Sequence, residues 1–299
     1  MTAFVRGVLA AAVLCTLLVG CGTGRSPDAL HGPSPGLSAE AASPRQGKPF
    51  RNTAPRFTPG PAGLTPVFRR AAASAAGKGR TVALTFDADM TADQGRRAAG
   101  GERFDNPALI ATLRELKVPA TVFMTGRWAE EYPDQARAIG GDPLFEIANH
   151  SYSHYAFTAP CYGLPVIRKQ EMRSDVERAF AAFRAAGVRN VVPYFRFPGG
   201  CYDDTALRAI GPAEVTAVQW DVVGGDAFAT DSDAVAEQVL SGVRPGSLVV
   251  MHCTRSAAPA TEQAIRKIVP ELRARGYRMV KVSELMRASL LAEDPAGAH

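Results

Sequence analysis

The sequence has few histidines, five among 299 residues, and two of them lie far from any regular apolar pattern. His31 is in a proline-rich stretch, and His299 is the last residue. The other three, His150, His154 and His252, lie directly beside apolar stretches of the kind that form strands. Every histidine of the expected folded part is therefore a candidate site residue.

Long apolar runs are absent beyond the start of the chain. Residues 1–20 carry one charge, Arg6, followed by an unbroken run of apolar and small residues. The run is too short for a membrane span and is typical of a signal peptide. The letters LVG before Cys21 resemble a bacterial lipobox, which predicts lipidation of Cys21 and a membrane-anchored, extracytoplasmic lipoprotein. The alternative is an ordinary signal peptide and a secreted protein, with Cys21 incidental.

Acidic residues are scarce between residues 22 and 80, where only Asp28 and Glu40 stand against nine lysines and arginines. The stretch is rich in Pro, Gly, Ala and Ser and has no apolar periodicity, so we expect residues 21–79 to form a tether. Most of the net charge of +5 lies in this basic segment. Such a segment beside a lipid anchor suits an anionic membrane or wall surface, and nothing in the sequence indicates binding to nucleic acid.

Cysteines are also few. Once those of the signal peptide and the lipidation position are set aside, Cys161, Cys201 and Cys253 remain. In an oxidising compartment this odd number allows one disulfide and leaves one thiol. Cys161 and Cys201 each lie in a loop with turn residues nearby, which favours a bridge between these two.

Residues 80–290 alternate short apolar stretches with longer amphipathic ones, and residues 291–299 read as a C-terminal tail. The strand-like stretches are TVALTF (81–86), ATVFM (120–124), LFEIA (144–148), VPYFRF (192–197), VTAVQW (215–220) and SLVVMH (247–252). Between them the apolar spacing is helical, with starts indicated at Asn106 and Asp231 and ends at Gly187 and Gly276. This alternation predicts one α/β domain with a parallel sheet, either closed or open.

Ionisable residues follow five of these strands at their C-terminal ends, where sites gather in parallel α/β folds. They are Asp87, Asp89, His150, His154, Arg196, Asp226 and His252. Two histidines four positions apart, together with a carboxylate, suit a catalytic divalent metal site that keeps open positions for water. Alone, this spacing would more often belong to structural histidines, but the carboxylates on neighbouring strand ends favour the metal site.

Five stretches, in order, resemble the motifs of a known family: LTFDAD, NHSYSH, YFRFPGG, WDVVGGDAF and LVVMH. They look like those of the NodB-type polysaccharide deacetylases, carbohydrate esterase family four, over residues 81–285. The resemblance implies a distorted (β/α) barrel, often of seven strands. It also implies metal-dependent removal of N-acetyl groups from amino sugars of a cell-wall or related polysaccharide. The metal expected is zinc, with cobalt, nickel or manganese as alternatives.

The resemblance implies a role for each matching residue. Asp87 matches the catalytic base and Arg196 the residue that holds it, while His252 matches the general acid and Asp226 the residue that tunes it. A metal would activate water, Asp87 would take its proton, and His252 would protonate the departing amine. A backbone N–H near Gly199 is expected to stabilise the oxyanion.

The metal ligands are where this sequence departs from the family pattern. His150 and His154 match two ligands, but Ala88 stands where an aspartate ligand is usual, and the next acid is Asp89. Our hypothesis is that Asp89 supplies the missing carboxylate, since residues 87 and 89 of an extended chain point to the same side. The rival is that the histidines and water alone hold the metal while Asp89 caps the loop.

Two other functions remain open, the first of them because Ala88 removes a familiar ligand. The domain could be an inactive carbohydrate-binding lipoprotein on the same fold, or it could hydrolyse another C–N amide bond. Retention of Asp87, Arg196, Asp226 and His252 argues against a mere binding protein, which has no need of an acid and base. Gly199 also stands where the family commonly has an aromatic residue, which predicts a more open groove.

Overall fold

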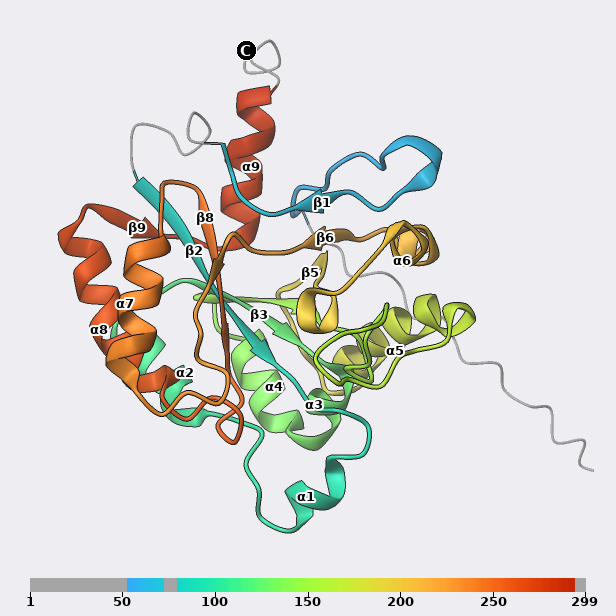
Figure 1. Ribbon diagram of the computed structural model, residues 1–299, viewed down its shortest axis with the longest axis horizontal. Helices are drawn as coiled ribbons and strands as arrows, with labels where there is room; N and C mark the ends of the chain where they lie inside the picture. Colours follow the sequence, from blue (N-terminus) through green and yellow to red (C-terminus); the bar gives the residue numbers. More distant parts are fainter. Residues whose placement is uncertain (1–52, 73–79, 294–299) are drawn as a thin grey trace, which may run out of the picture. The chain divides into compact units, whose positions relative to one another are not determined.

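The computed structural model describes residues 53–72 and 80–293, which form a curled sheet of parallel strands with helices around it (Figure 1). The sheet order is β1-β6-β5-β4-β3-β2-β8-β7, and β9 also pairs with β2. The strands are β1 (Val67–Phe68), β2 (Arg80–Ala88), β3 (Ala120–Met124), β4 (Phe145–Asn149), β5 (Val191–Phe195), β6 (Thr216–Val218), β7 (Val222–Val223), β8 (Ser247–His252) and β9 (Tyr277–Met279).

The sheet curls until its two sides meet. β6 pairs with β5, whereas β7, only a few residues later, pairs with β8, so residues 216–223 lie between the two sides. Arg70, just after β1, also forms an antiparallel bridge with Ser247 at the start of β8. This arrangement confirms the predicted distorted (β/α) barrel. The described residues form nine strands, whereas the resemblance implied seven. The apolar pattern missed β1, β7 and β9, which are only two or three residues long.

The helices begin and end largely where the sequence indicated. They are α1 (Gly95–Ala99), α2 (Pro107–Glu115), α3 (Gly126–Glu131), α4 (Pro133–Gly140), α5 (Met172–Ala185), α6 (Asp204–Ile210), α7 (Ser232–Gly242), α8 (Thr261–Ala274) and α9 (Val282–Glu293). Asn106 caps α2 by accepting a hydrogen bond from the N–H of Leu109, and Asp231 caps α7 in the same manner. Gly187 and Gly276, with φ of 71° and 79°, follow α5 and α8.

The strands are buried on both faces, as is usual for parallel sheets. One cluster takes a residue from each of six strands and fills the inside of the curled sheet: Ala83, Phe123, Ala148, Tyr194, Val218 and Leu248. A second cluster joins the other face of β2, through Val82, Leu84, Phe86 and Ala88, to the surrounding helices. The alternation along β2 therefore directs Asp87 to the inside and Ala88 to the helices.

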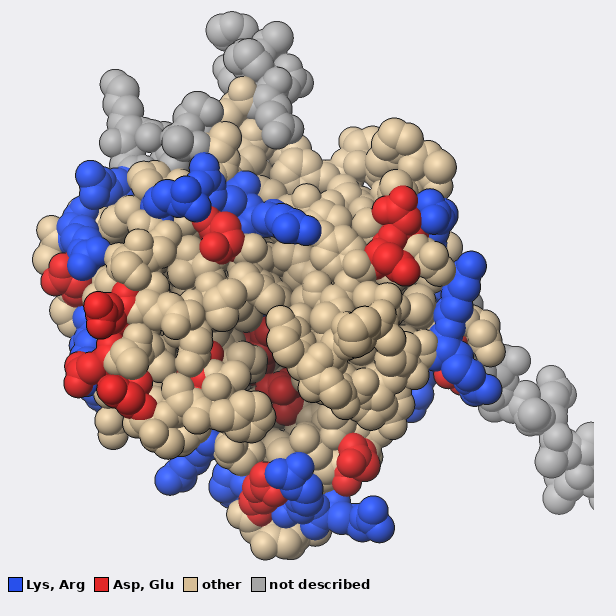
Figure 2. Space-filling view, in the orientation of Figure 1, with Lys and Arg blue, Asp and Glu red and all other residues tan. Residues whose placement is uncertain are grey.

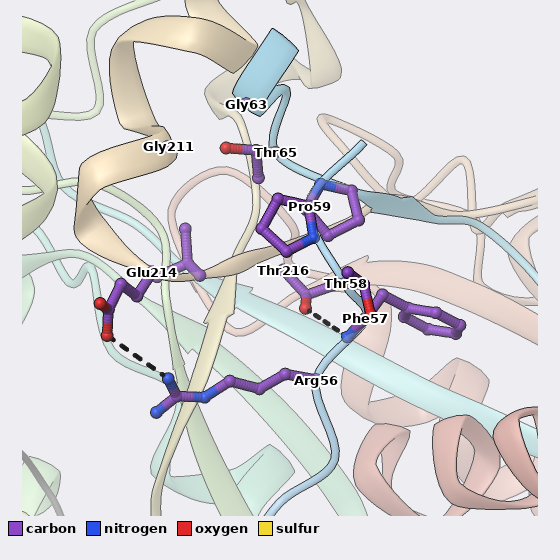
Figure 3. Close-up of a pocket in the computed structure, with 11 residues that line it drawn as sticks. Arg56, Phe57, Thr58, Pro59, Gly63, Thr65, Gly211, Glu214 and Thr216 are labelled. Atoms are coloured by element: carbon purple, nitrogen blue, oxygen red, sulfur yellow. Dashed lines mark hydrogen bonds and ion pairs between the residues drawn. The ribbon is translucent and has the colours of Figure 1, made fainter. Parts of the chain in front are cut away.

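The folded part begins earlier than the expected boundary at residue 80. Residues 53–72 lie on the domain: β1 pairs with β6, Phe68 is 5% exposed, and Phe57 stacks on it. The N–H of Phe57 donates to Thr216 Oγ1, and Arg56 lies 3.8 Å from Glu214 across a pocket (Figure 3). Phe57 and Phe68 anchor this Pro- and Gly-rich stretch to the domain. Two aromatic residues alone give no periodic pattern from which the contact could be predicted. At the other end, α9 extends to Glu293, past the expected boundary at residue 290.

Several predictions concern residues outside the described ranges, namely the signal peptide, the lipidation of Cys21 and the first part of the tether. Within the described ranges, no helix has the length and apolar character that a membrane crossing requires.

Candidate active site

The predicted site residues lie together at the C-terminal ends of the strands. Asp87 is in β2 and His252 ends β8, and the two are register partners on neighbouring strands. His150 directly follows β4, Arg196 follows β5, and Asp226 follows β7. Figure 2 shows acidic side chains at the bottom of a hollow on the face of the domain where β2 ends in Figure 1.

Arg196 holds Asp87 in a buried ion pair. Nη1 of Arg196 donates to Asp87 Oδ1 at 2.6 Å, and Arg196 Nε donates to the carbonyl oxygen of Val218 at 3.2 Å. The guanidinium is fully buried and lies 3.7 Å from the ring centroid of Phe123. A buried guanidinium with these contacts fixes the orientation of the carboxylate and leaves Oδ2 facing His150, 3.6 Å from Nε2.

His150 is neutral and presents Nε2 to the site. Its Nδ1 lies 2.9 Å from the carbonyl oxygen of Arg196, so Nδ1 carries the proton and donates it. Burial lowers the pKa of His150 to about 4, although the negative charge of Asp87 acts in the opposite direction. Burial likewise lowers the pKa of His154. A neutral imidazole with a free ring nitrogen is the form that binds metals.

A tight turn brings the two histidines together. Ser151 and His154 have φ of 69° and 57°, and the N–H of His154 donates to Ser151 Oγ at 2.9 Å. Asn149 Oδ1 accepts the N–H of Ser151, and Asp175 accepts that of Tyr152. The ring centroids of His150 and His154 are consequently 5.0 Å apart. The spacing of four is that of a turn, with no helix involved.

Asp89, and not residue 88, points toward the histidines. Asp89 Oδ2 lies 3.6 Å from His154 Nε2, while the fully buried Ala88 packs on the helix side of β2. The hydroxyl of Thr254 donates to Asp89 Oδ1. Burial acts to raise the pKa of Asp89, but the electrostatic interactions with His154 and His252 and the hydrogen bond from Thr254 outweigh it, so the pKa is lowered. Asp89 is therefore ionised at neutral pH.

His150, His154 and Asp89 have the donor atoms that a divalent metal prefers. Within the described ranges, no three His, Cys, Asp or Glu side chains converge closely enough to form a metal site. They form two pairs instead, Asp87 with His150 and Asp89 with His154, each at 3.6 Å. Two neutral imidazoles and an ionised carboxylate are nevertheless the donor set of catalytic zinc sites.

His252 is held by Asp226 in a charged pair. Asp226 Oδ1 accepts from His252 Nδ1 at 2.9 Å, and Oδ2 accepts the backbone N–H of His252 at 2.7 Å. The hydroxyl of Thr261 also donates to Oδ2, at 2.6 Å. Burial alone would lower the pKa of His252, but the hydrogen bond and charge of Asp226 raise it to about 9. His252 is therefore protonated at neutral pH, with its other ring N–H free to donate.

The sequence did not identify the residues that support these side chains. Thr254 bonds to Asp89, Thr261 bonds to Asp226, and Phe123 lies against Arg196. Thr254 carried a weak signal, since it lies two positions after His252. The other two carried none, because their contacts arise only when distant segments meet.

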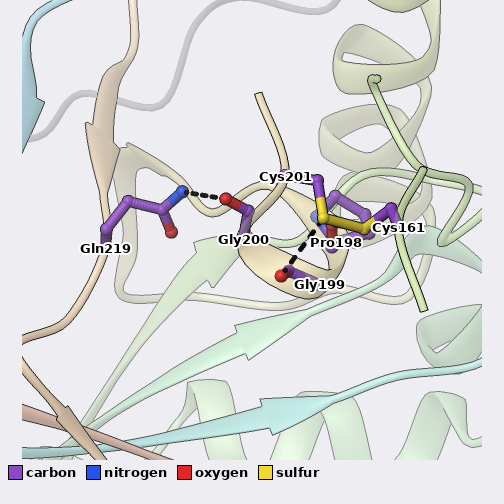
Figure 4. Close-up of a disulfide and its surroundings, with 6 residues drawn as sticks. All are labelled: Cys161, Pro198, Gly199, Gly200, Cys201 and Gln219. Carbon is purple, nitrogen blue, oxygen red and sulfur yellow. Dashed lines mark hydrogen bonds between the residues drawn. A yellow bond between two sulfur atoms is a disulfide. The ribbon is translucent and has the colours of Figure 1, made fainter. Parts of the chain in front are cut away.

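The predicted disulfide between Cys161 and Cys201 is confirmed (Figure 4). Cys253 is free and buried. The bridge joins the loop before α5 to the turn Pro198–Gly200, which follows Arg196. Gly199 has φ of 62°, and a Cβ placed there would lie 2.6 Å from Cys161 Sγ. The bridge thus occupies the space that a side chain at residue 199 would need.

Comparisons with known proteins agree with the motifs. Residues 74–218 match the family model described as polysaccharide deacetylase. A chitooligosaccharide deacetylase of Sinorhizobium fredii is 29% identical over 181 residues, which cover 57% of this chain and 80% of that protein. A peptidoglycan-N-acetylglucosamine deacetylase of Bacillus cereus is 27% identical over 210 residues, which cover 70% of this chain and 69% of that protein.

The fold is also found in a solved structure of carbohydrate esterase family 4. A solved structure of a carbohydrate esterase family 4 pseudoenzyme from Bacillus anthracis superimposes with a TM-score of 0.59. It is 23% identical and covers 77% of this chain and 70% of that chain, so it supports the fold alone. Motifs, fold and family model agree that residues 74–218 match a polysaccharide deacetylase domain.

Proposed function

We propose that the domain is a divalent-metal-dependent hydrolase that removes N-acetyl groups from the amino sugars of a cell-wall or related polysaccharide. The observation that carries the proposal is the pairing of a base and an acid. Asp87 and His252 are register partners on β2 and β8, one fixed by Arg196 and the other held protonated by Asp226. A site that only bound sugar would need neither pair.

A metal completes this chemistry. His150, His154 and Asp89 would hold the ion, because their side chains have the right donor types and protonation states. When bound, zinc or a similar ion polarises the acetamide carbonyl and lowers the pKa of water.

The protein's own residues then move the protons. The carboxylate of Asp87, fixed at Oδ1 by Arg196, accepts the proton of the attacking water at Oδ2. His252 bonds to Asp226 through Nδ1, so its Nε2–H is the proton that it donates to the departing amine. An amine leaves poorly unless it is protonated, and this donation prevents the tetrahedral intermediate from falling back. As the family resemblance implies, a backbone N–H near Gly199 would donate to the oxyanion.

We also propose that the protein works outside the cytoplasm, anchored to the membrane through Cys21. The Cys161–Cys201 bridge supports this location, since disulfides persist in oxidising compartments. The named activities of the two relatives, on chitooligosaccharide and peptidoglycan, support an N-acetylated glycan as substrate.

The activity can be tested by mass spectrometry of acetylated oligosaccharides after incubation with the protein. We expect N-acetylglucosamine oligomers to lose acetyl groups and gain free amines, and O-acetylated oligomers to change far less. The Asp87→Asn variant is the matched control, since it keeps the shape of the side chain but cannot take the proton. Equal products from wild type and this variant would exclude the proposed mechanism.

The second candidate is a carbohydrate-binding protein without activity. It is favoured by Ala88, which stands where the family has an acidic ligand, and by the pseudoenzyme that shares the fold. Glycan binding without release of acetate from any member of the panel would support this candidate.

The pH profile should report the state of His252. Because Asp226 raises the pKa of His252 to about 9, the acid form is present at neutral pH and is lost as the pH rises through about 9. We expect kcat/KM to fall on the alkaline side near that pH, and Asp226→Asn to move the fall toward lower pH. A wild-type profile that already declines near pH 6.5, the usual pKa of histidine, would contradict the assignment.

A further inference from the structure

Basic side chains gather at the end of the domain that lies opposite the candidate site. Arg80 begins β2 and has Tyr277 of β9 as its register partner. The N–H of Arg244 donates to Ser247 Oγ at the start of β8. Figure 2 shows lysine and arginine side chains along the edge where β2 begins in Figure 1. The residues at these strand starts and on α9, which we call the basic end, are Arg80, Arg244, Arg275, Arg278, Lys281 and Arg287.

Nearby acidic residues leave much of this charge without a partner. Glu271 and Glu284 each pair with one arginine of the basic end, at 2.8 and 3.6 Å. Arg80, Arg244 and Arg287 are exposed, and none of them forms an ion pair with a carboxylate of the described residues. Exposed charges of one sign that lie together attract an oppositely charged surface, and their effects add up. The basic end therefore suits an anionic partner.

α9 adds an apolar side chain to this end. Leu291 is 57% exposed and lies one turn beyond Arg287 on the same side of the helix. In Figure 1, α9 projects from the side where β2 begins, away from the site. A helix that presents basic and apolar residues together suits the boundary between lipid headgroups and acyl chains. A purely polyanionic partner, such as nucleic acid or a wall polymer, would gain nothing from the leucine.

The chain also joins the domain at this end. The carbonyl oxygen of Thr53 accepts a hydrogen bond from Arg287 Nη2 at 3.5 Å. Thr53 lines a cavity together with Lys281 and Phe145, and Phe145 is the first residue of β4. The part of the chain that precedes Thr53 includes Cys21. A lipid on Cys21 would therefore hold the domain by its basic end.

The site lies at the other end of the same strands. Asp87 comes seven positions after Arg80 in β2, and a strand rises about 3.3 Å per residue, so the two residues lie about 23 Å apart along the strand. Likewise, His252 ends the strand that Ser247 begins. Contact between the basic end and a bilayer would leave the site open to polymers outside it.

We propose that the basic end docks on a bilayer of anionic phospholipids, so that the docked domain holds its site away from the lipid. The inference rests on the proposed location outside the cytoplasm and extends it from the anchor to the domain itself. An anionic bilayer attracts each nearby Lys or Arg, and the attraction falls off within a Debye length. The exposed arginines of the basic end consequently contribute only when they lie at the headgroups.

Vesicle binding by the unlipidated protein tests the proposal. Residues 22–299 contain the tether and every described residue but cannot be lipidated, so their binding reports the polypeptide alone. Co-sedimentation with vesicles of phosphatidylglycerol and phosphatidylcholine gives the partition coefficient. It is measured for wild type and for a basic-end variant that combines Arg80→Gln, Arg244→Gln and Arg287→Gln.

A matched control replaces three exposed arginines that follow the C-terminal ends of strands. It combines Arg96→Gln after β2, Arg168→Gln after β4 and Arg255→Gln after β8, and it has the same net charge and tether as the basic-end variant. We expect the basic-end variant to bind about 100-fold more weakly than wild type, because each Lys or Arg at an anionic bilayer contributes about fivefold. The control should stay within about twofold of wild type.

Hydrogen exchange of the vesicle-bound wild type tests the orientation. We expect slower exchange at residues 243–247 and 275–291, and unchanged exchange at 150–156 and 252–257. Equal binding of the two triple variants would show that the tether alone holds the lipid and would overturn the inference, as would slower exchange at the site. Binding to purified anionic wall polymer without binding to vesicles would overturn lipid as the partner. Neither measurement depends on acetate release or on lipidation, so both stay decisive if the proposed activity or anchor fails.

Discussion

Replacement of His252 with alanine is expected to lower kcat by about 10²- to 10⁴-fold while the zinc content stays at the wild-type level. The side chain is bound to Asp226 through Nδ1 and is protonated at neutral pH, so we expect it to act as an acid and not as a metal ligand. Its loss leaves the amine unprotonated. The measurements are the rate of acetate release and the metal content of the purified protein.

The control for this variant is Thr261→Val. The hydroxyl of Thr261 donates to Asp226, which in turn holds His252, so its loss should weaken the support of the acid and reduce kcat far less than His252→Ala does. Zinc lost together with activity in His252→Ala would show that His252 is a ligand, and the assignment would be wrong.

Asp89→Asn is expected to weaken zinc binding by more than about 100-fold. Replacement of groups that merely support metal ligands costs 10- to 100-fold, and loss of an anionic ligand should cost more. The structure supports this role, because Asp89 is ionised and lies 3.6 Å from His154 Nε2. Asparagine keeps the size and one oxygen, so the change removes mainly the charge. Competition with a chromophoric chelator measures the affinity.

Two further variants make this test specific. Asp93→Asn removes a carboxylate that is close in sequence but bonded to Thr91, and it should leave zinc affinity within about twofold. Asp87→Asn should keep most of the affinity and lose turnover. If Asp89→Asn binds zinc as tightly as wild type while Asp87→Asn does not, the roles of ligand and base are exchanged and the hypothesis fails.

Much of the fold and the site could be predicted from the sequence because the signals were local. Each of the six predicted strands is a run of apolar residues, and each overlaps a strand of the structure. Parallel strands place their C-terminal ends at one edge, so the ionisable residues after them had to lie near one another. Their pairing, such as Asp87 with Arg196, followed from the motif order and is seen in the structure.

The rest depended on contacts between distant segments. The ordered stretch 53–72 holds to the domain through β1 and a few side chains, which no periodicity reveals. The direction of Asp89 depends on the end of β2 and on Thr254, which is 165 positions away in the chain. The charge of His252 depends on Asp226 at a distance that only the fold defines. The roles assigned to these residues stay predictions until they are measured.

We infer that Asp87, His252 and the residues around them form a working, metal-dependent deacetylase site despite Ala88. The most direct measurement is acetate release from N-acetylglucosamine oligomers by the protein before and after its metal is stripped with a chelator, and again after zinc is restored. We expect stripping to abolish release and zinc to return it to the initial rate. A stripped protein that still releases acetate at the full rate, or a zinc-loaded protein that releases none, would contradict it.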